Sequence, residues 1–261
     1  MNNPNVKTIE SLANDEVKML KSLSRVKYRN QSKLFLVENL KIISDALDSG
    51  HLFDSLYYSA DFEEKNSQII SKFKEKNPKA RFFQISEKIN KQCSQLTTAS
   101  GIIALYKMKE MSLQEGPIIY LNSISDPGNL GTIIRSALAF GFINIVMGEG
   151  CVDLYNSKVI SAAKEAIFKT NILVAKDADW LKTEIYNKQI PIYSTNAQKG
   201  RDVLQFKPES NYCLVLGSES HGTSEEIEAL SSDSIRIEIS KDIESLNVAI
   251  AASIIFHRLS E

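Results

Sequence analysis

From residue 118 to the C-terminus, short apolar segments alternate with longer segments whose apolar residues recur at helical spacing. The apolar segments predict strands over residues 118–121, 142–147, 172–174, 190–194, 212–216 and 235–239. The longer segments predict helices over residues 130–140, 157–168, 178–186, 224–230 and 246–259. Because residues 213–216 are apolar without interruption, they are typical of a strand that is buried on both faces. We therefore expect an α/β/α fold, a mostly parallel sheet covered by helices on both sides.

The first half of the chain shows a smaller alternation of the same kind. Apolar segments predict strands over residues 35–37, 55–59, 81–85 and 101–106, and helical spacing predicts helices over residues 9–24, 39–48 and 63–76. Residues 107–117 are mostly polar and end in the breaker sequence Glu115-Gly116-Pro117. We therefore predict two domains, a small α/β domain over residues 1–113 and the parallel α/β domain over residues 114–261.

Composition narrows the class of protein. The 261 residues are 43% hydrophobic, but no stretch approaches the 18 or so apolar residues that a membrane span needs. The first residues lack the apolar core of a signal peptide. Three scattered cysteines form no CxxC pair, and the three histidines are dispersed. We expect a cytoplasmic protein with no membrane association and no metal site.

The charge is distributed unevenly between the two halves. Residues 1–113 contain 18 Lys and Arg against 13 Asp and Glu, a net +5, and the remainder contains 13 against 19, a net −6. Residues 18–33 contain six basic residues and no acidic one: Lys18, Lys21, Arg25, Lys27, Arg29 and Lys33. Such a cluster indicates a phosphate-binding surface or a solvated basic helix face, and the pattern alone does not separate the two.

Three segments join a predicted strand to a predicted helix, where ligands of parallel sheets bind. In the first, residues 126–135, Asn129 can cap the helix, Gly131 allows close backbone approach and Arg135 lies further along. A helix start with an arginine can bind phosphate, or it can be a capped helix with a surface arginine.

The second and third segments follow later strands. Residues 216–222 place Glu219 between Gly217 and Gly222, a loop whose backbone can approach a ligand. Residues 237–248 place Ser245 and Asn247 at the start of the last helix, where capping is the simplest role. Each segment alone is weak evidence for a site.

Together, in this order and at these spacings, the three segments resemble the motifs of the SpoU/TrmH family of RNA ribose 2'-O-methyltransferases, within the SPOUT superfamily. The family's NxGxxxR corresponds to Asn129, Gly131 and Arg135, and its GxExxG corresponds to Gly217, Glu219 and Gly222. Its SLN signature corresponds to residues 245–247. The first half of the chain resembles, more loosely, the family's substrate-binding domain.

The resemblance implies a small L30e-like domain followed by a SPOUT domain with a trefoil knot, S-adenosylmethionine as cofactor, and an obligate homodimer. It implies that the substrate is RNA, with ribosomal RNA favoured over transfer RNA. The residues that it implies at the cofactor are Thr195, Asn196, Gly217, Gly222, Ile237, Ile239 and Leu246. Those that it implies in catalysis are Arg135, Asn129, Glu219, Ser245 and Asn247.

A guanidinium group is not deprotonated in proteins, so Arg135 is a poor candidate for a base. We expect it to bind the phosphate beside the target ribose and to stabilise the developing alkoxide, while the proton passes to phosphate or water. Asn129, Ser245 and Asn247 would orient Arg135 and the ribose. The basic cluster would bind RNA backbone, and Tyr28 would be a candidate for base stacking, whereas Phe35 is expected in the core.

Several positions depart from the family pattern. Glu238, Lys241, Glu165 and Asn39 stand where proline or glycine is usual, and Ser220-His221 is unusual within the second motif. These departures leave open a non-catalytic RNA-binding protein of the same fold, and a tRNA-directed methyltransferase is a second alternative. A nucleotide-binding enzyme is disfavoured because neither GxxxxGK[ST] nor GxGxxG is present.

Overall fold

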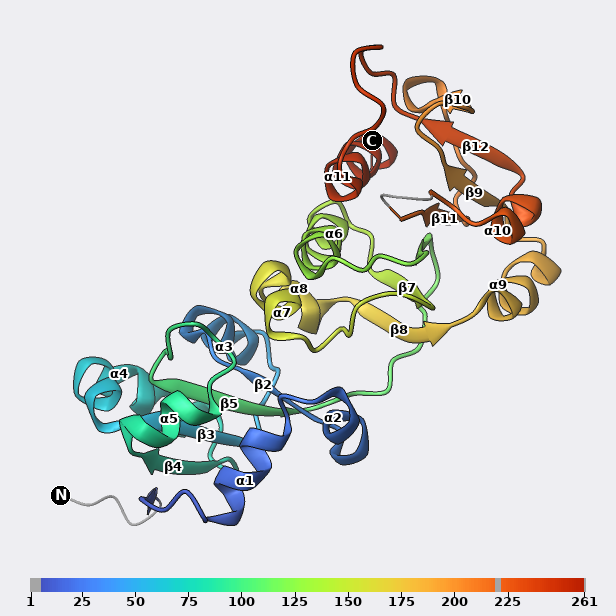
Figure 1. Cartoon of the computed structure of the whole chain (residues 1–261). Helices are drawn as coiled ribbons and strands as arrows, with labels where there is room; N and C mark the ends of the chain where they lie inside the picture. Colours follow the sequence, from blue (N-terminus) through green and yellow to red (C-terminus); the bar gives the residue numbers. More distant parts are fainter. Residues whose placement is uncertain (1–5, 219–221, 261) are drawn as a thin grey trace. The chain divides into compact units, whose positions relative to one another are not determined.

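The computed structural model describes residues 6–218 and 222–260. The chain divides into two compact units, Met1–Lys109 and Glu110–Glu261, and the division falls in the polar segment between the two alternations (Figure 1).

The N-terminal unit is built on a five-stranded mixed sheet in the order β1-β4-β3-β5-β2. The strands β1, β4 and β3 are parallel, whereas β5 runs antiparallel to β3 and β2. Their bounds are β1 Val6–Ile9, β2 Leu34–Val37, β3 Ser55–Ser59, β4 Arg81–Ile85 and β5 Ile102–Lys107. The helices are α1 Asp15–Ser22, α2 Val26–Ser32, α3 Leu40–Asp48, α4 Ala60–Lys76 and α5 Glu87–Cys93.

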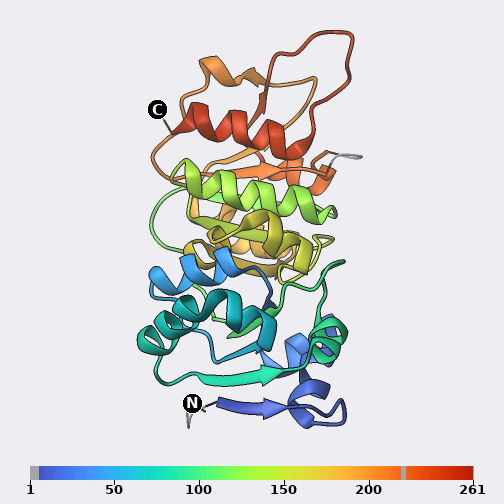
Figure 2. The same cartoon turned by 90° about the vertical axis from the view of Figure 1, so that its left-hand side faces the viewer.

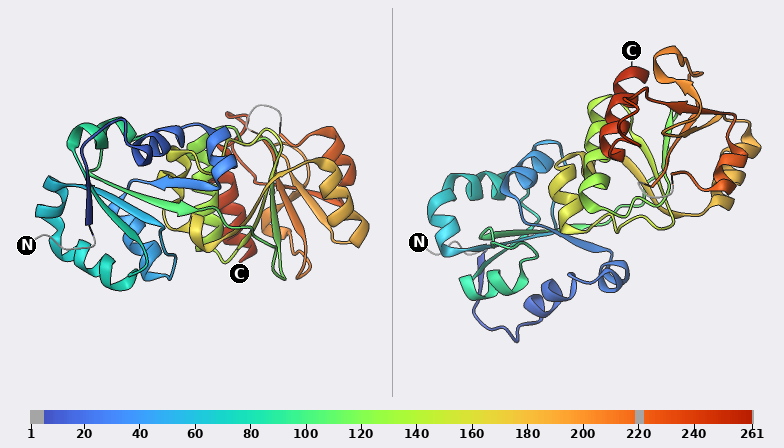
Figure 3. Two further views of the ribbon diagram at one scale, coloured as in Figure 1. Left: turned by 90° about the horizontal axis from the view of Figure 1, so that it is seen from below. Right: turned by 45° about the horizontal axis from the view of Figure 1, so that its top comes forward.

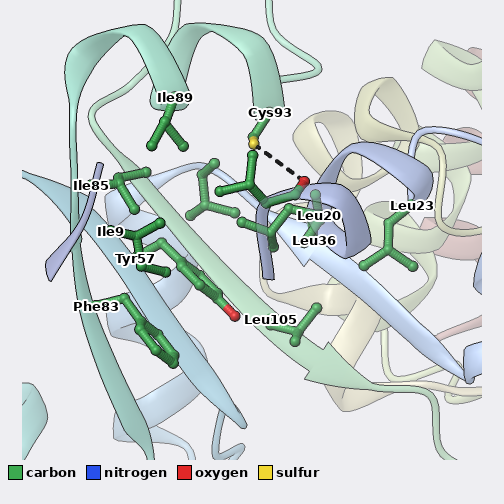
Figure 4. Close-up of a cluster of buried hydrophobic side chains, with 12 residues drawn as sticks. Ile9, Leu20, Leu23, Leu36, Tyr57, Phe83, Ile85, Ile89, Cys93 and Leu105 are labelled. Atoms are coloured by element: carbon green, nitrogen blue, oxygen red, sulfur yellow. Dashed lines mark hydrogen bonds between the residues drawn. The ribbon is translucent and has the colours of Figure 1, made fainter. Parts of the chain in front are cut away.

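One core of this unit lies between the sheet and the helices α1 and α5. Figure 4 shows Leu20 and Leu23 from the α1 segment and Ile89 and Cys93 from α5 over the sheet. The Cys93 thiol donates to the carbonyl of Val17 at 4.0 Å, which joins the two helices (Figure 4). The apolar spacing that predicted a helix over residues 9–24 reflects this buried face of α1.

The predicted start of that helix at residue 9 is wrong. Ile9 ends the strand β1, which pairs with β4, and its side chain is 5% exposed. The helix begins at Asp15 because Asn14 caps it, accepting a hydrogen bond from the backbone N–H of Glu16 at 2.9 Å. The short helix α5 was not predicted.

The C-terminal unit is built on a seven-stranded sheet in the order β10-β12-β9-β11-β6-β7-β8. Every pairing between these strands in the described part of the chain is parallel, as expected for an α/β/α fold. The bounds are β6 Ile118–Leu121, β7 Asn144–Gly148, β8 Asn171–Lys176, β9 Ile192–Thr195, β10 Arg201–Asp202, β11 Cys213–Leu216 and β12 Asp233–Arg236.

Helices cover both faces of this sheet (Figure 3). One face carries α6 Pro127–Ala139, α7 Ser157–Ala163, α8 Ala166–Lys169 and α11 Val248–Leu259. Figure 2 shows α11, α6 and α7 side by side, and α6 packs against both of the others. The other face carries α9 Ala178–Glu184 and α10 Glu225–Leu230, whose buried Leu181 and Ile227 contact the strands. The 3-10 turns η1 Tyr186–Lys188 and η2 Val203–Gln205 complete the unit.

Two predicted elements of this unit are wrong at their bounds. The helix expected over residues 157–168 is broken between α7 and α8 at Lys164, whose φ of 56° and ψ of −141° are not helical. The strand expected over residues 235–239 ends at Arg236 because Ile237 and Ile239 leave the sheet and line a cavity instead.

In the described residues, none of the helices has the length and apolar composition needed to cross a membrane.

Candidate functional site

The first motif segment forms the start of α6. Asp126, not Asn129, is the N-cap, and its carboxylate accepts from the backbone N–H of Asn129 at 2.8 Å. Pro127 occupies the first helical position, where its missing N–H costs no hydrogen bond. The prediction that Asn129 caps the helix is therefore wrong, because the helix starts two residues before it. Because the Asn129 side chain does not cap the helix, it is available for another contact.

That contact is with the third motif segment. The side-chain amide of Asn247 donates to the side-chain oxygen of Asn129 at 3.0 Å. Asn247 is also the N-cap of α11, since its side-chain oxygen accepts from the N–H groups of Ala249 at 3.0 Å and Ile250 at 3.3 Å. One side chain thus starts a helix and fixes the position of α6 relative to α11.

Gly131 is required for helix packing rather than for contact with a ligand. A methyl group placed on it would lie 2.5 Å from the Cβ of Ala162 and 2.6 Å from the carbonyl oxygen of Val159. Both atoms belong to α7. The close backbone approach expected at this glycine is therefore the approach of α7 to α6.

Arg135 lies two helical turns beyond Asn129 on α6, and its side chain is exposed. Among the described residues it makes no ion pair, and it makes no hydrogen bond to Asn129, Ser245 or Asn247. The structure of one chain therefore does not bring Arg135 together with the residues predicted to orient it.

The described residues of the second motif segment pair with each other after β11. Ser218 and Gly222 exchange two backbone hydrogen bonds of 2.9 Å each. A methyl group on Gly217 would lie 2.2 Å from the backbone carbon of Gly222, so the loop can close only over a glycine. Glu219, Ser220 and His221, including the predicted catalytic Glu219, lie outside the described residues.

Asn122, which sequence reasoning missed, fixes the far end of this loop. Its side-chain oxygen accepts from the backbone N–H of Ser224 at 3.1 Å, and its own N–H donates to Leu216. The hydroxyl of Thr223 donates to the carbonyl of Thr195 at 3.4 Å. The end of β6 and the end of β9 therefore both hold the loop 217–223.

These loops enclose a cavity of about 290 Å³. All seven residues predicted at the cofactor line it: Thr195, Asn196, Gly217, Gly222, Ile237, Ile239 and Leu246. Ser245 also lines it, whereas Asn129, Arg135 and Asn247 do not belong to its described lining. The motif residues thus form two neighbouring groups, one around the cavity and one at the start of α6.

Sequence reasoning missed other lining residues because they fall outside the motifs. Gln198, Glu228, Val248, Ala251 and Ile255 line the same cavity. The backbone N–H groups of Gln198 and Lys199 bind the side-chain oxygen of Asn196, which shapes the turn after β9. A turn signal at Asn196 could have indicated this loop.

The departures from the family pattern leave the cavity intact. Glu238 and Lys241 are exposed and do not belong to the described lining. Glu165 has an ordinary helical conformation, with φ of −68° and ψ of −12°, so it needs no glycine. Asn39 caps α3 by accepting from the N–H of Ile42 at 3.2 Å.

In the N-terminal unit, five of the six basic residues are exposed and lie on or beside α1 and α2: Lys18, Lys21, Arg25, Lys27 and Lys33. Lys18 pairs with Asp15 at 2.9 Å, and Lys21 donates to Gln92 at 3.0 Å. Tyr28 on α2 is 38% exposed, whereas Phe35 is buried and stacks on Tyr106.

Arg29 is the exception, and its prediction as a phosphate contact is wrong. Its side chain is 3% exposed, and its guanidinium donates to the carbonyl of Leu23 at 2.6 Å. This carbonyl follows the end of α1, so Arg29 satisfies a backbone acceptor that the helix leaves open. The spacing of basic residues in the sequence does not reveal that Arg29 is buried while its neighbours are exposed.

The cysteines are poor nucleophiles. Burial raises the pKa of the Cys93 thiol to about 11 and raises the pKa values of Cys151 and Cys213 above the ordinary range. The Cys151 thiol donates to the carbonyl of Leu121 at 3.3 Å and so helps to hold the segment between β6 and α6. Within residues 6–218 and 222–260, no group of three or more His, Cys, Asp or Glu is placed to bind a metal ion.

Comparison with known proteins identifies the two units. Residues 116–257 match the SpoU rRNA methylase family, and residues 14–104 match the MRM3-like substrate binding domain. The chain belongs to the SpoU rRNA methylase family. It is therefore an RNA methyltransferase, which confirms the resemblance that the three motifs indicated.

The similarity to known proteins extends over nearly the whole length of both chains. The chain is 27% identical over 255 residues to the Bacillus subtilis 23S rRNA (guanosine(2553)-2'-O)-methyltransferase RlmP, covering 97% of this chain and 99% of the relative. A TrmH-family protein from Porphyromonas gingivalis superimposes with a TM-score of 0.81 at 29% identity, covering 95% and 98% of the two chains. The AdoMet-bound rRNA methyltransferase from Sinorhizobium meliloti has the same fold, with a TM-score of 0.82 at 23% identity and 97% coverage of each chain.

Proposed function

We propose that this protein transfers a methyl group from S-adenosylmethionine to a ribose 2'-hydroxyl of ribosomal RNA. The observation that carries the proposal is the convergence of the second and third motifs of a SpoU methylase on one cavity, with the first motif bonded to the third through Asn129 and Asn247. The relative from Bacillus subtilis is named for the same reaction on 23S rRNA.

The cavity fits S-adenosylmethionine in both size and chemistry. Its volume of about 290 Å³ lies at the lower end of the range for small-molecule sites. Ile237, Ile239 and Leu246 supply apolar surface for a flat ring, and residues 195–198, 217–218 and 222–223 supply polar groups. Because a side chain cannot be accommodated at Gly217, the loop backbone itself forms the wall.

When bound there, S-adenosylmethionine supplies a methyl group activated by its sulfonium charge. The protein must hold the RNA ribose in line with it and stabilise the negative charge that develops on the 2'-oxygen. Arg135 is suited to this role because its cation is exposed on the helix that carries Asn129. It would bind the neighbouring phosphate, and the proton would leave to that phosphate or to water.

We also propose that the active enzyme is a homodimer. Ile250 and Ile254 are 54% and 40% exposed, and they lie four residues apart on one face of α11. Arg135 lies outside the described lining of its own chain's cavity. A second copy docked through α11 would cover the isoleucines and could bring the Arg135 of one protomer to the cavity of its partner.

The trefoil knot implied by the family is part of the same proposal. The strand β11 lies between β9 and β6, and after β12 on the far side of β9 the chain returns to pack α11 against α6. A chain whose C-terminal segment passes through one of its own loops must return across the sheet in this way. The cytoplasmic location stays a prediction.

The test is methylation of ribosomal RNA from a strain that lacks the gene, with labelled S-adenosylmethionine, followed by nucleoside analysis. A 2'-O-methylated nucleoside is expected, and Arg135→Ala should abolish its formation while leaving S-adenosylmethionine binding measured by calorimetry unchanged. Thr132→Ala, at an exposed position one turn earlier on α6, is the matched control and should keep its activity.

Three results would contradict the proposal. Methylation of a base would change the reaction, methylation of transfer RNA alone would change the substrate, and cofactor binding without methylation would favour a non-catalytic RNA-binding protein. Light scattering tests the dimer, because a mass of one 29.2 kDa chain at micromolar concentration is incompatible with it.

A further inference from the structure

The cavity has an unusual charge balance. Among the described residues that line it, Glu228 is the one with a formal charge, and the others are apolar, small or neutral polar. Two arginines on the neighbouring strands bind other groups: Arg201 pairs with Asp233 at 2.9 Å, and the Nε of Arg236 donates to the carbonyl of Gly200. The cavity therefore presents a carboxylate and no cation from its described lining.

The Glu228 side chain is exposed, and its backbone belongs to α10, where its N–H donates to the carbonyl of Ser224 at 2.9 Å. The same helix is anchored by Ile227, which is 1% exposed, and by the bond from the Ser224 N–H to Asn122. Glu228 makes no ion pair with any residue that the structure describes, so no protein cation neutralises its charge locally.

We propose that Glu228 determines the preference of the cavity for the cationic methyl donor over the neutral product. This inference rests on the proposed function. S-adenosylmethionine carries a net charge of +1, from an ammonium, a carboxylate and a sulfonium. Loss of the methyl group turns the sulfonium into a neutral thioether, so S-adenosylhomocysteine has no net charge. A carboxylate at the wall attracts the donor, and this attraction disappears when the methyl group is transferred.

The size of the preference follows from Coulomb's law. Because Glu228 is exposed, water screens its attraction for a cation to an energy that corresponds to about a two- to fivefold change in affinity. The preference must decrease with added salt, because the Debye length falls from about 10 Å at 0.1 M to about 3 Å at 1 M. The acidic balance of residues 114–261 acts in the same direction.

The test compares the dissociation constants of S-adenosylmethionine and S-adenosylhomocysteine by calorimetry for the wild type and Glu228→Gln. The amide keeps the size of the side chain and removes its charge. We expect a two- to fivefold loss of affinity for the donor, a change of less than twofold for the product, and convergence of wild type and variant at 1 M salt. Glu226→Gln, at an exposed position of α10 outside the described lining, is the control and should change neither constant.

Results that contradict the role of Glu228 differ from results that contradict the proposed function. Equal changes for donor and product, no change for either, or the same effect from Glu226→Gln would overturn the role of Glu228 while leaving the methyltransferase intact. A wild type that binds neither compound would overturn the proposed function and this inference with it. Glu228→Ala, at the same exposed position, repeats the comparison with the same expected changes if Glu228→Gln does not fold.

Discussion

Replacing Gly131 with alanine tests whether the packing of α6 on α7 sets the geometry of the first motif. The added methyl group would lie 2.5 Å from the Ala162 Cβ, 2.6 Å from the Val159 carbonyl oxygen and 2.8 Å from the Ala163 backbone nitrogen. Two of these are backbone atoms that cannot rotate away. Restoring ordinary contact at 3.4 Å requires the two helices to separate by 0.9 Å, the difference between 3.4 and 2.5.

The expected cost combines two opposing effects. Overpacking of a tight interface costs about 1–3 kcal/mol, and backbone contacts favour the upper half of that range. Alanine in a helix interior gains about 1 kcal/mol over glycine. The net expectation is a loss of about 1–2 kcal/mol in the free energy of unfolding. Because Arg135 moves with α6, a shift near 1 Å should also lower the methylation rate by up to about 100-fold.

Trp180 provides the assay. It is the chain's one tryptophan, and it lies in the C-terminal unit stacked on Tyr120, so its fluorescence in urea reports the unfolding of that unit. With a slope of about 2 kcal/mol per molar urea, the midpoint should fall by about 0.5–1 M. Thr132→Ala is the control, because Thr132 is exposed on the same helix and its replacement removes no packed contact with α7. An unchanged or higher midpoint for Gly131→Ala would show that the contact with α7 is not tight.

Three further variants test other parts of the structure. Lys164→Gly should raise the Trp180 urea midpoint through about 1 kcal/mol of stabilisation, because the backbone there costs a side-chain-bearing residue about 1–3 kcal/mol; a lower midpoint would refute the strain. Arg29→Ala should lower the melting temperature of the N-terminal unit in circular dichroism, since the Leu23 carbonyl loses its 2.6 Å bond and keeps the longer bond of 3.4 Å from the Gln95 side chain. Lys27→Ala should keep that temperature and flatten the salt dependence of RNA affinity by about 0.7–0.9. Identical behaviour of the two variants would contradict the distinction between them. Asn247→Ala should cost about 0.5–2 kcal/mol in the same fluorescence assay by removing the cap of α11, and a neutral result would mean that the cap is dispensable.

The sequence predicted secondary structure best where breaker or polar residues mark the ends of a short segment. The strands β6 and β11 and the helix α10 were predicted within one or two residues because Pro117, Gly217, Ser224 and Ser231 mark their limits. The predicted ends are wrong where the apolar pattern continues beyond the point at which the helix or strand stops. Ile237 and Ile239 alternate as in a strand, yet they line a cavity, and Lys164 interrupts a helix without any breaker residue nearby.

The site was predicted from motifs and not from local physics. Gly217 and Gly222 line the cavity as expected, and the steric reason for Gly217 becomes visible only in three dimensions, since the atoms that exclude a side chain come from five and six residues later. Glu228 and Asn122 belong to no motif, so only the fold places them at the loop. Arg29 is an example of the opposite kind: the sequence pattern predicted a surface role for it, but its side chain is buried.

The contact between Asn129 and Asn247 explains how the first and third motifs can act together although 118 residues separate them in the chain. Asn247 caps α11, and the segment just before it, with Ser245 and Leu246, forms a wall of the cavity. Asn129 lies in the first turns of α6, which also carries Arg135. Further along the same two helices, the hydroxyl groups of Ser136 and Ser253 form another hydrogen bond, of 2.8 Å. Residues 245–247 at the cavity wall and the helix that carries Arg135 are therefore joined by side-chain contacts between α6 and α11, not only through the sheet.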